Sequence, residues 1–208
     1  MNSATQSLSL QGGAGVIEAL LDAPAHASPC GTAVIAHPHP LFGGTMHNKV
    51  VQTLARAFVQ CGWKVVRFNF RGVEGSAGEH AHGVGEGQDM LEVIRQVAPE
   101  GALALAGFSF GAYVTCRVVD ALADVRVVEK LVLVGTAASR FEVAKVPPQW
   151  HERTLVLHGE QDETVPLSSV MDWARPQTLP VTVIPGVEHF FHGQLPLLKS
   201  LVSRHLRA

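Results

Sequence analysis

The chain of 208 residues lacks long apolar stretches, and no segment approaches the roughly 20 apolar residues of a transmembrane helix. The first eleven residues are polar and lack a basic region followed by an apolar one, so we expect no signal peptide. An excess of charge is missing too, because 16 Lys and Arg residues stand against 18 Asp and Glu residues. These absences argue against a membrane protein, and against nucleic acid or an anionic membrane as the partner.

Cysteine is also scarce. Cys30, Cys61 and Cys116 are odd in number and far apart, which argues against a disulfide framework and indicates a reducing compartment. We therefore expect a cytoplasmic protein. Apolar residues make up 47% of the chain and charged residues 16%, as in an ordinary globular protein, and the length suits one domain over residues 1–208.

Two kinds of apolar segment alternate along the chain. Short runs that are apolar on both faces predict buried strands, and apolar residues at helical spacing predict helices. A hairpin is expected over 7–10 and 16–21, joined by the glycine-rich run 12–15, and further strands are expected over 32–36, 64–70, 103–108, 130–135, 154–158 and 181–185. Helices are expected over 48–60, 86–97, 112–123 and 195–206. The alternation predicts an α/β fold with a mostly parallel central sheet and helices on both faces.

A serine lies between two glycines where a predicted strand meets a predicted helix. The sequence Gly107-Phe108-Ser109-Phe110-Gly111 joins strand 103–108 to helix 112–123. Because glycine has no Cβ, the strand and the helix can approach closely, and the sharp turn presents the serine hydroxyl at the end of the strand. The alternative is a glycine-rich turn with a capping serine.

Two later loops supply what a serine nucleophile requires. Asp162 follows strand 154–158, and His189 follows strand 181–185. Ligands of such sheets bind beyond the carboxyl ends of the strands, where these residues should meet. A serine hydroxyl needs an imidazole to take its proton, and that imidazole needs a carboxylate to fix its tautomer. The order serine, acid, histidine therefore predicts a catalytic triad of Ser109, Asp162 and His189.

Five segments together resemble a known family. They are His37-Pro38-His39-Pro40-Leu41-Phe42-Gly43-Gly44, Asn69-Phe70-Arg71-Gly72, the pentapeptide around Ser109, His158-Gly159-x-x-Asp162-x-x-Val165-Pro166 and His189-Phe190-Phe191. On these segments the chain resembles the small lidless bacterial α/β-hydrolases, which are related to dienelactone hydrolase and the small carboxylesterases. The resemblance implies the α/β-hydrolase fold with a minimal cap or none, the same triad and no cofactor. Glu74 departs from the glycine-rich run of these relatives, so the shape of its loop stays open.

Acyl transfer also requires backbone N–H groups that stabilise the oxyanion. Phe110, directly after Ser109 at the helix N-terminus, should supply the first. The second should come from the loop after strand 32–36, where Pro38 and Pro40 have no N–H, so the donor is His39, Leu41 or a later residue. The resemblance to dienelactone hydrolase implies Leu41.

Other residues could replace members of the triad. His192 lies three residues beyond His189 and could be the base instead. Glu160 and Glu163 flank Asp162 and could orient the histidine, although solvated loop charges are the simpler interpretation.

Two histidine pairs have the spacing of metal ligands, namely His37 with His39 and His80 with His82. Neither pair has an acidic or cysteine cluster nearby at metal spacing, so we expect no metal site.

The run Gly83-x-Gly85-x-Gly87 lacks the ending of a phosphate loop and predicts a flexible linker. Arg71 and Glu74 could pair within their loop, and Trp173, Phe190 and Phe191 could line an acyl pocket or pack in the core.

The segment between strands 130–135 and 154–158 has about twenty residues, which leaves little room for a lid. We therefore expect a serine hydrolase, a carboxylesterase that acts on small or short-chain acyl esters through an acyl-enzyme. Thioesters, lactones and peptides stay open as substrates of the same triad. A binding protein that kept the fold without turnover is the alternative from another class.

Overall fold

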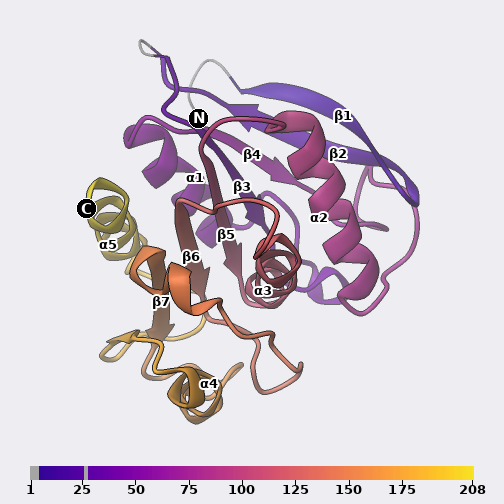
Figure 1. Cartoon of the computed structure of the whole chain (residues 1–208). Helices are drawn as coiled ribbons and strands as arrows, with labels where there is room; N and C mark the ends of the chain where they lie inside the picture. The colour runs from indigo at the N-terminus through magenta and orange to yellow at the C-terminus, as the bar shows by residue number, and fades with distance from the viewer. Residues whose placement is uncertain (1–4, 26–27) are drawn as a thin grey trace.

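The computed structural model describes residues 5–25 and 28–208, and they form one sheet flanked by helices (Figure 1). The strands are β1 (Gln6–Gly12), β2 (Gly15–Asp22), β3 (Thr32–Ala36), β4 (Lys64–Phe68), β5 (Leu103–Phe108), β6 (Lys130–Val134), β7 (Thr154–Gly159) and β8 (Val181–Ile184). The α-helices are α1 (Lys49–Gln60), α2 (Val84–Val97), α3 (Phe110–Leu122), α4 (Leu167–Ala174) and α5 (Leu195–Arg207). Short 3-10 helices are η1 (Pro40–Phe42), η2 (Pro148–Arg153) and η3 (Arg175–Gln177).

The eight strands lie in the order β1-β2-β4-β3-β5-β6-β7-β8. β2 pairs antiparallel with β1 and with β4, and every pair from β4 through β8 is parallel. β5, which leads to Ser109, has a parallel neighbour on each side, and all six of its residues are buried. The predicted α/β fold with a mostly parallel sheet is confirmed.

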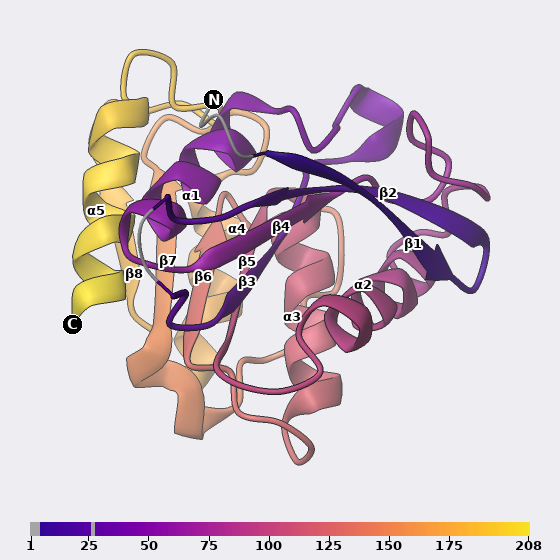
Figure 2. The same ribbon diagram turned by 90° about the horizontal axis from the view of Figure 1, so that it is seen from above.

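Two apolar cores lie on opposite faces of this sheet. Ile35 of β3 packs on one face with Leu54 and Phe58 of α1, and α5 completes that layer. Val34, the neighbour of Ile35, belongs to the core on the other face, with Val114 of α3 and with α2 and α4. Figure 2 shows α1 and α5 on one side of the sheet and α2 and α3 on the other. Side chains that alternate between two covered faces explain why β3 and β5 are buried along their whole length, whereas the edge strand β1 alternates polar and apolar residues.

Helix α1 begins where the sequence predicts, because the side chain of Asn48 accepts the N–H of Val50 at 2.9 Å. Helix α2 begins earlier than predicted, at Val84, so the expected flexible linker at 83–87 was wrong. The buried carboxylate of Glu86 accepts the N–H groups of Ala81 and Gly83 at 2.8 and 2.7 Å. These bonds satisfy the amides that precede the helix and fix its start.

The sequence did not predict α4. This helix has only eight residues and buries two of them, Val170 and Ala174, so its periodic signal is weak.

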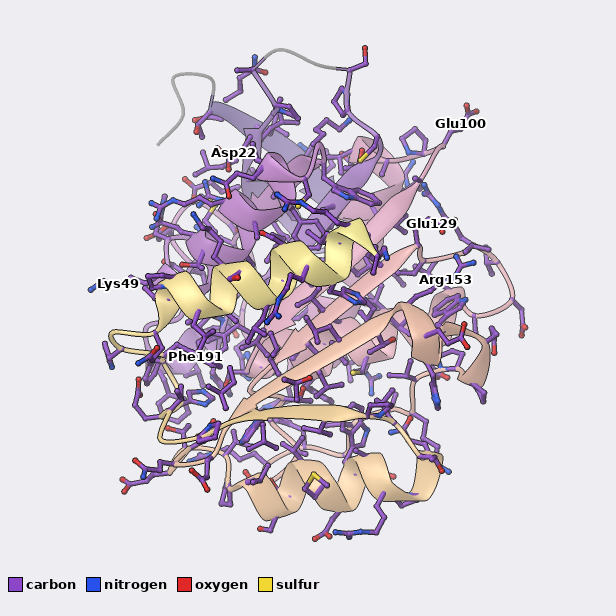
Figure 3. The ribbon with its side chains drawn as sticks, turned by 90° about the vertical axis from the view of Figure 1, so that its left-hand side faces the viewer. Asp22, Lys49, Glu100, Glu129, Arg153 and Phe191 are labelled. Carbon is purple, nitrogen blue, oxygen red and sulfur yellow. The ribbon has the colours of Figure 1, made fainter. Side chains whose placement is uncertain are left out.

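Between β6 and β7 the chain forms η2 and irregular segments, in keeping with a minimal cap. Figure 3 shows α5 lying across the face of the sheet opposite to α4. Phe191 is fully buried and lies close to the start of α5.

The loop after β4 is held by charged side chains. Arg71 pairs with Asp89 of α2 at 2.7 Å rather than with Glu74. Glu74 has a φ of 47°, and its carboxylate accepts the side-chain N–H of Asn69 at 2.7 Å. A glutamate therefore takes the left-handed conformation that glycine would adopt freely.

Across the described ranges, no helix combines the length and the apolar character that a membrane span needs.

Candidate active site

Ser109 lies at the turn between β5 and α3 with φ 56° and ψ −116°, a strained conformation for a residue with a side chain. The turn is tight enough that a Cβ on Gly107 would collide with the backbone of Gly111. A Cβ on Gly111 would in turn collide with the carbonyl oxygens of Ala36 and His37, at the end of β3. Both glycines are therefore required for close backbone contact, as the sequence predicts.

Ser109, His189 and Asp162 form a continuous hydrogen-bonded chain. His189 Nε2 lies 3.0 Å from Ser109 Oγ, and His189 Nδ1 lies 2.6 Å from Asp162 Oδ2. The other oxygen of Asp162, Oδ1, accepts the N–H groups of Thr164 and Val165 at 3.0 and 2.7 Å. All three side chains are buried. The structure thus brings together the residues that the sequence proposed as a triad.

Parallel strands explain how residues so far apart in sequence meet. β5, β6, β7 and β8 are consecutive in the sheet, and their carboxyl ends lie at one edge. Ser109 follows β5, Asp162 follows β7, and His189 follows β8. Ser109 and His189, which are 80 residues apart, are thereby held at hydrogen-bond distance.

His158 is a buried neighbour of this chain that the sequence analysis gave no role. Its Nε2 lies 2.9 Å from the carbonyl oxygen of Val165 and 3.5 Å from Asp162 Oδ2. Burial lowers the pKa of His158, which favours the neutral ring. A neutral His158 that donates to Val165 fixes the turn whose N–H groups hold Asp162. The only sequence signal for it was its place at the start of the Asp162 segment.

The alternative triad members lie elsewhere. His192 is 72% exposed and lies 3.0 Å from Glu188, its neighbour on the same turn. Glu160 accepts the N–H of Gly186, and Glu163 is exposed. None of the three has a hydrogen bond to the Ser109 chain among the described residues.

The loop from His37 to Gly44 forms one wall of the site. His37 is buried, with Nε2 accepting the N–H of Phe70 at 3.0 Å and Nδ1 lying 2.6 Å from the carbonyl oxygen of Pro38. Burial lowers the pKa of His37 to about 4, so the ring is neutral near pH 7. The neutral ring donates to Pro38, accepts from Phe70, and anchors the loop to the strand beside it.

The structure does not place the N–H of Leu41 at the reaction centre. That N–H donates to Nδ1 of His39 at 3.2 Å, and the Leu41 side chain points to solvent with 69% exposure. The N–H groups of Phe42, Gly43 and Gly44 bond to carbonyls within the same loop. Among the described residues, the N–H groups of His39 and Phe110 have no hydrogen-bond acceptor within the chain. The N–H of Leu41, which the resemblance implied as the second donor, is thus engaged within its own loop in this structure.

A cavity of about 290 Å³ opens above Ser109. It is lined by Pro38, His39, Phe42, Gly43, Gly44, Asn48, Ser109, Phe110, Ala137, Arg140, Phe141, Thr164, Val165, His189 and Phe190. Of the predicted pocket aromatics only Phe190 lines it, because Phe191 is in the core and Trp173 donates to the carbonyl of Ala144. Arg140, Ala137 and Phe141 were not predicted, since they come from an irregular segment without a motif.

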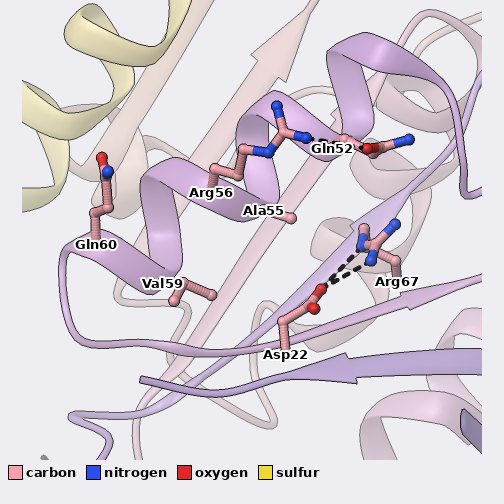
Figure 4. A pocket seen from close by; sticks show the side chains of 7 residues that line it. All are labelled: Asp22, Gln52, Ala55, Arg56, Val59, Gln60 and Arg67. Atoms are coloured by element: carbon pink, nitrogen blue, oxygen red, sulfur yellow. Dashed lines mark hydrogen bonds and ion pairs between the residues drawn. The ribbon is translucent and has the colours of Figure 1, made fainter. Parts of the chain in front are cut away.

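A second cavity of about 220 Å³ lies between α1 and the strands β2 and β4 (Figure 4). It is lined by Asp22, Gln52, Ala55, Arg56, Val59, Gln60 and Arg67. It contains none of the triad residues. Its central feature is an ion pair in which Arg67 Nε and Nη2 donate to Asp22 Oδ2 at 3.1 and 2.9 Å.

The histidine pairs considered as metal ligands have other neighbours. His80 Nδ1 lies 2.9 Å from Glu86 Oε1, although not in hydrogen-bonding orientation, and the ring of His80 packs against that of His82 with 4.9 Å between centroids. Within residues 5–25 and 28–208 there is no group of three histidine, cysteine, aspartate or glutamate side chains arranged to hold a metal ion.

Comparison with known proteins agrees with this geometry. Residues 27–150 match the family described as serine aminopeptidase, S33 (Hydrolase_4). The uncharacterized protein RP471 of Rickettsia prowazekii is 31% identical over 185 residues, which cover 84% of this chain and 77% of that protein. A lidless α/β serine hydrolase of Xanthomonas campestris, XC6422, is 36% identical with a TM-score of 0.87, covering 100% of this chain and 95% of that one. An α/β serine hydrolase homologue of Coxiella burnetii is 38% identical with a TM-score of 0.81, covering 97% of each chain. The chain therefore belongs to the Hydrolase_4 family and is an α/β serine hydrolase of the lidless type.

Proposed function

We propose that this protein is a carboxylesterase that hydrolyses small or short-chain acyl esters through an acyl-enzyme. The observation that supports this most directly is the chain of hydrogen bonds from Ser109 Oγ through His189 to Asp162, at the floor of a small open cavity. A hydroxyl 3.0 Å from an imidazole that is itself oriented by a carboxylate is the arrangement that activates serine.

The reaction proceeds in two halves. Ser109 Oγ bonds to the ester carbonyl carbon while its proton passes to His189 Nε2, and the carbonyl oxygen becomes an oxyanion. The bond to the alcohol oxygen then breaks, and His189 gives its proton to that oxygen. Water attacks the acyl carbon, its proton passes to His189, and the bond to Ser109 Oγ breaks as the serine recovers the proton. Asp162 keeps its charge throughout and stabilises the protonated imidazole.

The oxyanion is held by backbone N–H groups. Phe110, at the N-terminus of α3, supplies one of them, because its N–H has no acceptor within the described chain. We assign the second to His39 in place of Leu41, because the N–H of Leu41 already donates to the His39 ring. The loop before His39 is in close contact with the serine turn, since a Cβ on Gly111 would strike the carbonyls of Ala36 and His37. Two donors that converge on one oxygen stabilise the tetrahedral intermediate.

The cavity is open, and no helical lid lies between β6 and β7 among the described residues. An ester substrate can therefore reach Ser109 directly. The esterase Pf2001 of Pyrococcus furiosus shares this fold with a TM-score of 0.74 at 14% identity, so the scaffold is compatible with ester hydrolysis. Thioesters and lactones would use the same residues. We propose a small-molecule substrate in the cytoplasm, where the free thiols Cys30, Cys61 and Cys116 would stay reduced.

A peptidase is the second candidate, because the matching family is described as serine aminopeptidase. An aminopeptidase must bind the N-terminal ammonium of its substrate, and a carboxylate at the cavity would do so. The described residues that line the cavity include no aspartate or glutamate. This charge pattern favours an ester over a peptide with a free N-terminus.

The test is hydrolysis of p-nitrophenyl esters from acetate to octanoate by the wild type and by Ser109→Ala, with alanine p-nitroanilide in parallel. Turnover of the short esters that disappears in Ser109→Ala supports the esterase. Turnover of the anilide alone supports the peptidase. A serine that neither turns over these substrates nor reacts with a fluorophosphonate probe would support a binding protein without activity.

A further inference from the structure

We propose that the cavity selects esters that contain an aromatic ring with an anionic substituent, and that Arg140 is the residue that recognises the anion. This inference rests on the proposed function, because it names the substrate class of the same site. It arises from two features that acyl transfer itself does not require: an aromatic wall and an arginine at the mouth of the cavity.

The aromatic wall is built on His39. The ring centroid of His39 lies 4.7 Å from that of Phe110, 4.9 Å from that of Phe42 and 6.0 Å from that of Phe141. Phe110 and Phe141 are themselves 5.3 Å apart. All four residues line the cavity, and Phe42 is 74% exposed at its mouth. The Phe110 ring is fully buried, so the aromatic surface offered to a ligand comes from His39, Phe42 and Phe141. Aromatic faces and edges at these separations favour a planar ring as the next member of the cluster.

Arg140 provides a positive charge at the same wall. The guanidinium carbon lies 5.8 Å from the centroid of the Phe42 ring, within the range of a cation–π contact. No carboxylate lies within ion-pair distance of this side chain among the described residues. Arg56, Arg117, Arg126, Arg204 and Arg207 have no ion pair there either, but Arg140 is the arginine that lines the cavity above Ser109. An arginine without a partner beside an apolar surface is a binding group for a carboxylate, which it can hold with two parallel hydrogen bonds.

The rest of the cavity leaves this charge uncompensated. Apart from its histidines, the described lining residues include no other charged side chain. The pKa of His39 is lowered, first by burial and then by the nearby charges of His80 and Arg140, with Glu86 acting in the opposite direction.

Size sets a further limit on the substrate. A cavity of about 290 Å³ is at the lower end of the range of about 300–1,000 Å³ usual for small-molecule sites. It suits one ring and a short acyl or alkyl group. A ring stacked on the wall, with its ester at Ser109, presents a substituent on its far edge to Arg140.

The experiment compares two matched pairs of substrates in which a carboxylate is replaced by a neutral amide. The pairs are 4-acetoxybenzoate with 4-acetoxybenzamide, and monomethyl terephthalate with methyl 4-carbamoylbenzoate. They place the charge on the alcohol side and on the acyl side of the ester, respectively. In the wild type the anionic member of at least one pair should have the higher kcat/KM. In Arg140→Met that preference should fall about tenfold, and Arg140→Lys should keep part of it.

The matched control is Arg95→Met, which removes an exposed arginine of α2 that is paired with Glu92, and it should keep the wild-type preference. Raising the salt concentration from about 0.05 M to about 1 M should weaken the preference of the wild type but not that of Arg140→Met. Binding of monomethyl terephthalate to the Ser109→Ala protein gives a readout without turnover, and Arg140→Met should weaken it about tenfold.

The inference is overturned if both neutral amides are hydrolysed as well as their anionic partners, or if Arg140→Met leaves the preference unchanged. In either case hydrolysis that depends on Ser109 would still support the esterase. If Ser109→Ala leaves all rates unchanged, the proposed function fails, and the substrate class fails with it.

The aromatic wall is tested separately through Phe42, whose exposure makes its replacement safe for folding. Phe42→Ala should lower kcat/KM for phenyl acetate relative to ethyl acetate several-fold, because a stacking face is lost. An unchanged ratio would mean that the wall does not bind the ring. Val125→Ala, at another exposed apolar residue that does not line the cavity, is the control.

Discussion

The cavity above Ser109 and the cavity beside Arg67 have similar volumes, about 290 and 220 Å³, and at least one arginine lines each of them. They differ in how those charges are satisfied. Arg67 donates to Asp22 through two nitrogens and to the carbonyl of Met46 through the third, and its side chain is only 6% exposed. Arg140 lines the Ser109 cavity, and no carboxylate among the described residues lies within ion-pair distance of it. The carboxylate of Asp162 is not part of that lining and is bonded to His189.

This contrast shows that the presence of charged residues in a cavity does not by itself indicate binding. The Asp22–Arg67 pair uses its hydrogen-bonding capacity within the protein and joins β2 to β4, so its role is structural. The Ser109 cavity instead leaves two backbone N–H groups and a guanidinium without internal partners among the described residues, beside a serine that is bonded to His189. Groups that the fold leaves unsatisfied are the ones available to a substrate.

The largest effect should come from Asp162→Asn. Oδ1 of Asp162 accepts two backbone N–H groups, so the amide nitrogen of asparagine would take the place of Oδ2 beside His189 Nδ1. His189 would then carry its proton on Nε2 and could not accept the proton of Ser109. We expect kcat for p-nitrophenyl acetate to fall about 10⁴-fold. Glu163→Gln, at the exposed neighbour, is the control, and an equal loss there would contradict the assignment of Asp162.

Arg67→Met should affect stability and leave turnover by the folded protein unchanged. The variant leaves the half-buried carboxylate of Asp22 without its arginine, so the free energy of unfolding should fall by about 1–3 kcal/mol in a urea titration. The double variant Asp22→Leu, Arg67→Met removes both charges and should recover most of that loss. A large fall in kcat/KM for Arg67→Met, at temperatures where the variant is folded, would mean that the cavity beside Arg67 also contributes to turnover.

His39→Pro tests the second oxyanion donor. The φ of His39 is −56°, which proline can adopt, so the substitution removes the N–H without forcing the backbone. Compared with His39→Ala, which keeps the N–H, we expect kcat to fall by a further factor of about 10²–10³. Leu41→Pro is the matched comparison. If Leu41→Pro is the variant that loses turnover, the donor implied by family resemblance is correct and His39 is not the donor.

His37→Gln should change how stability depends on pH. The pKa of His37 is lowered from 6.5 in the unfolded chain to about 4 in the native protein. Above pH 6.5 the ring is neutral in both states and its contribution is fully present. As the pH falls from 6.5 to 4 only the unfolded chain takes up the proton, so up to about 3 kcal/mol of stability is lost. Glutamine does not titrate, so the difference in unfolding free energy between wild type and variant should shrink over this range, and parallel profiles would contradict the prediction.

The sequence predicted most of the fold because its central strands are apolar on both faces. Glycine or asparagine residues also mark where several helices and strands begin or end. It predicted the residues of the Ser109 chain because each follows a strand in a recognisable order. It could not predict α4, whose eight residues bury only Val170 and Ala174. It could not predict Arg140 and Phe141 either, since only tertiary structure brings this irregular segment to the cavity. The choice between His39 and Leu41 depended on which N–H the His39 ring accepts, and a sequence does not show this.

The parts of the active site are made at widely separated times during synthesis. The loop with His39 and the turn with Ser109 leave the ribosome well before β8 and the loop with His189, which lies 80 residues after the serine. A nascent chain therefore contains an inert serine until the far edge of the sheet has docked. Parallel strands pair only after long connections have closed, so this docking comes late and is slow. Hydrolytic activity therefore reports complete folding. During refolding, activity should return later than secondary structure.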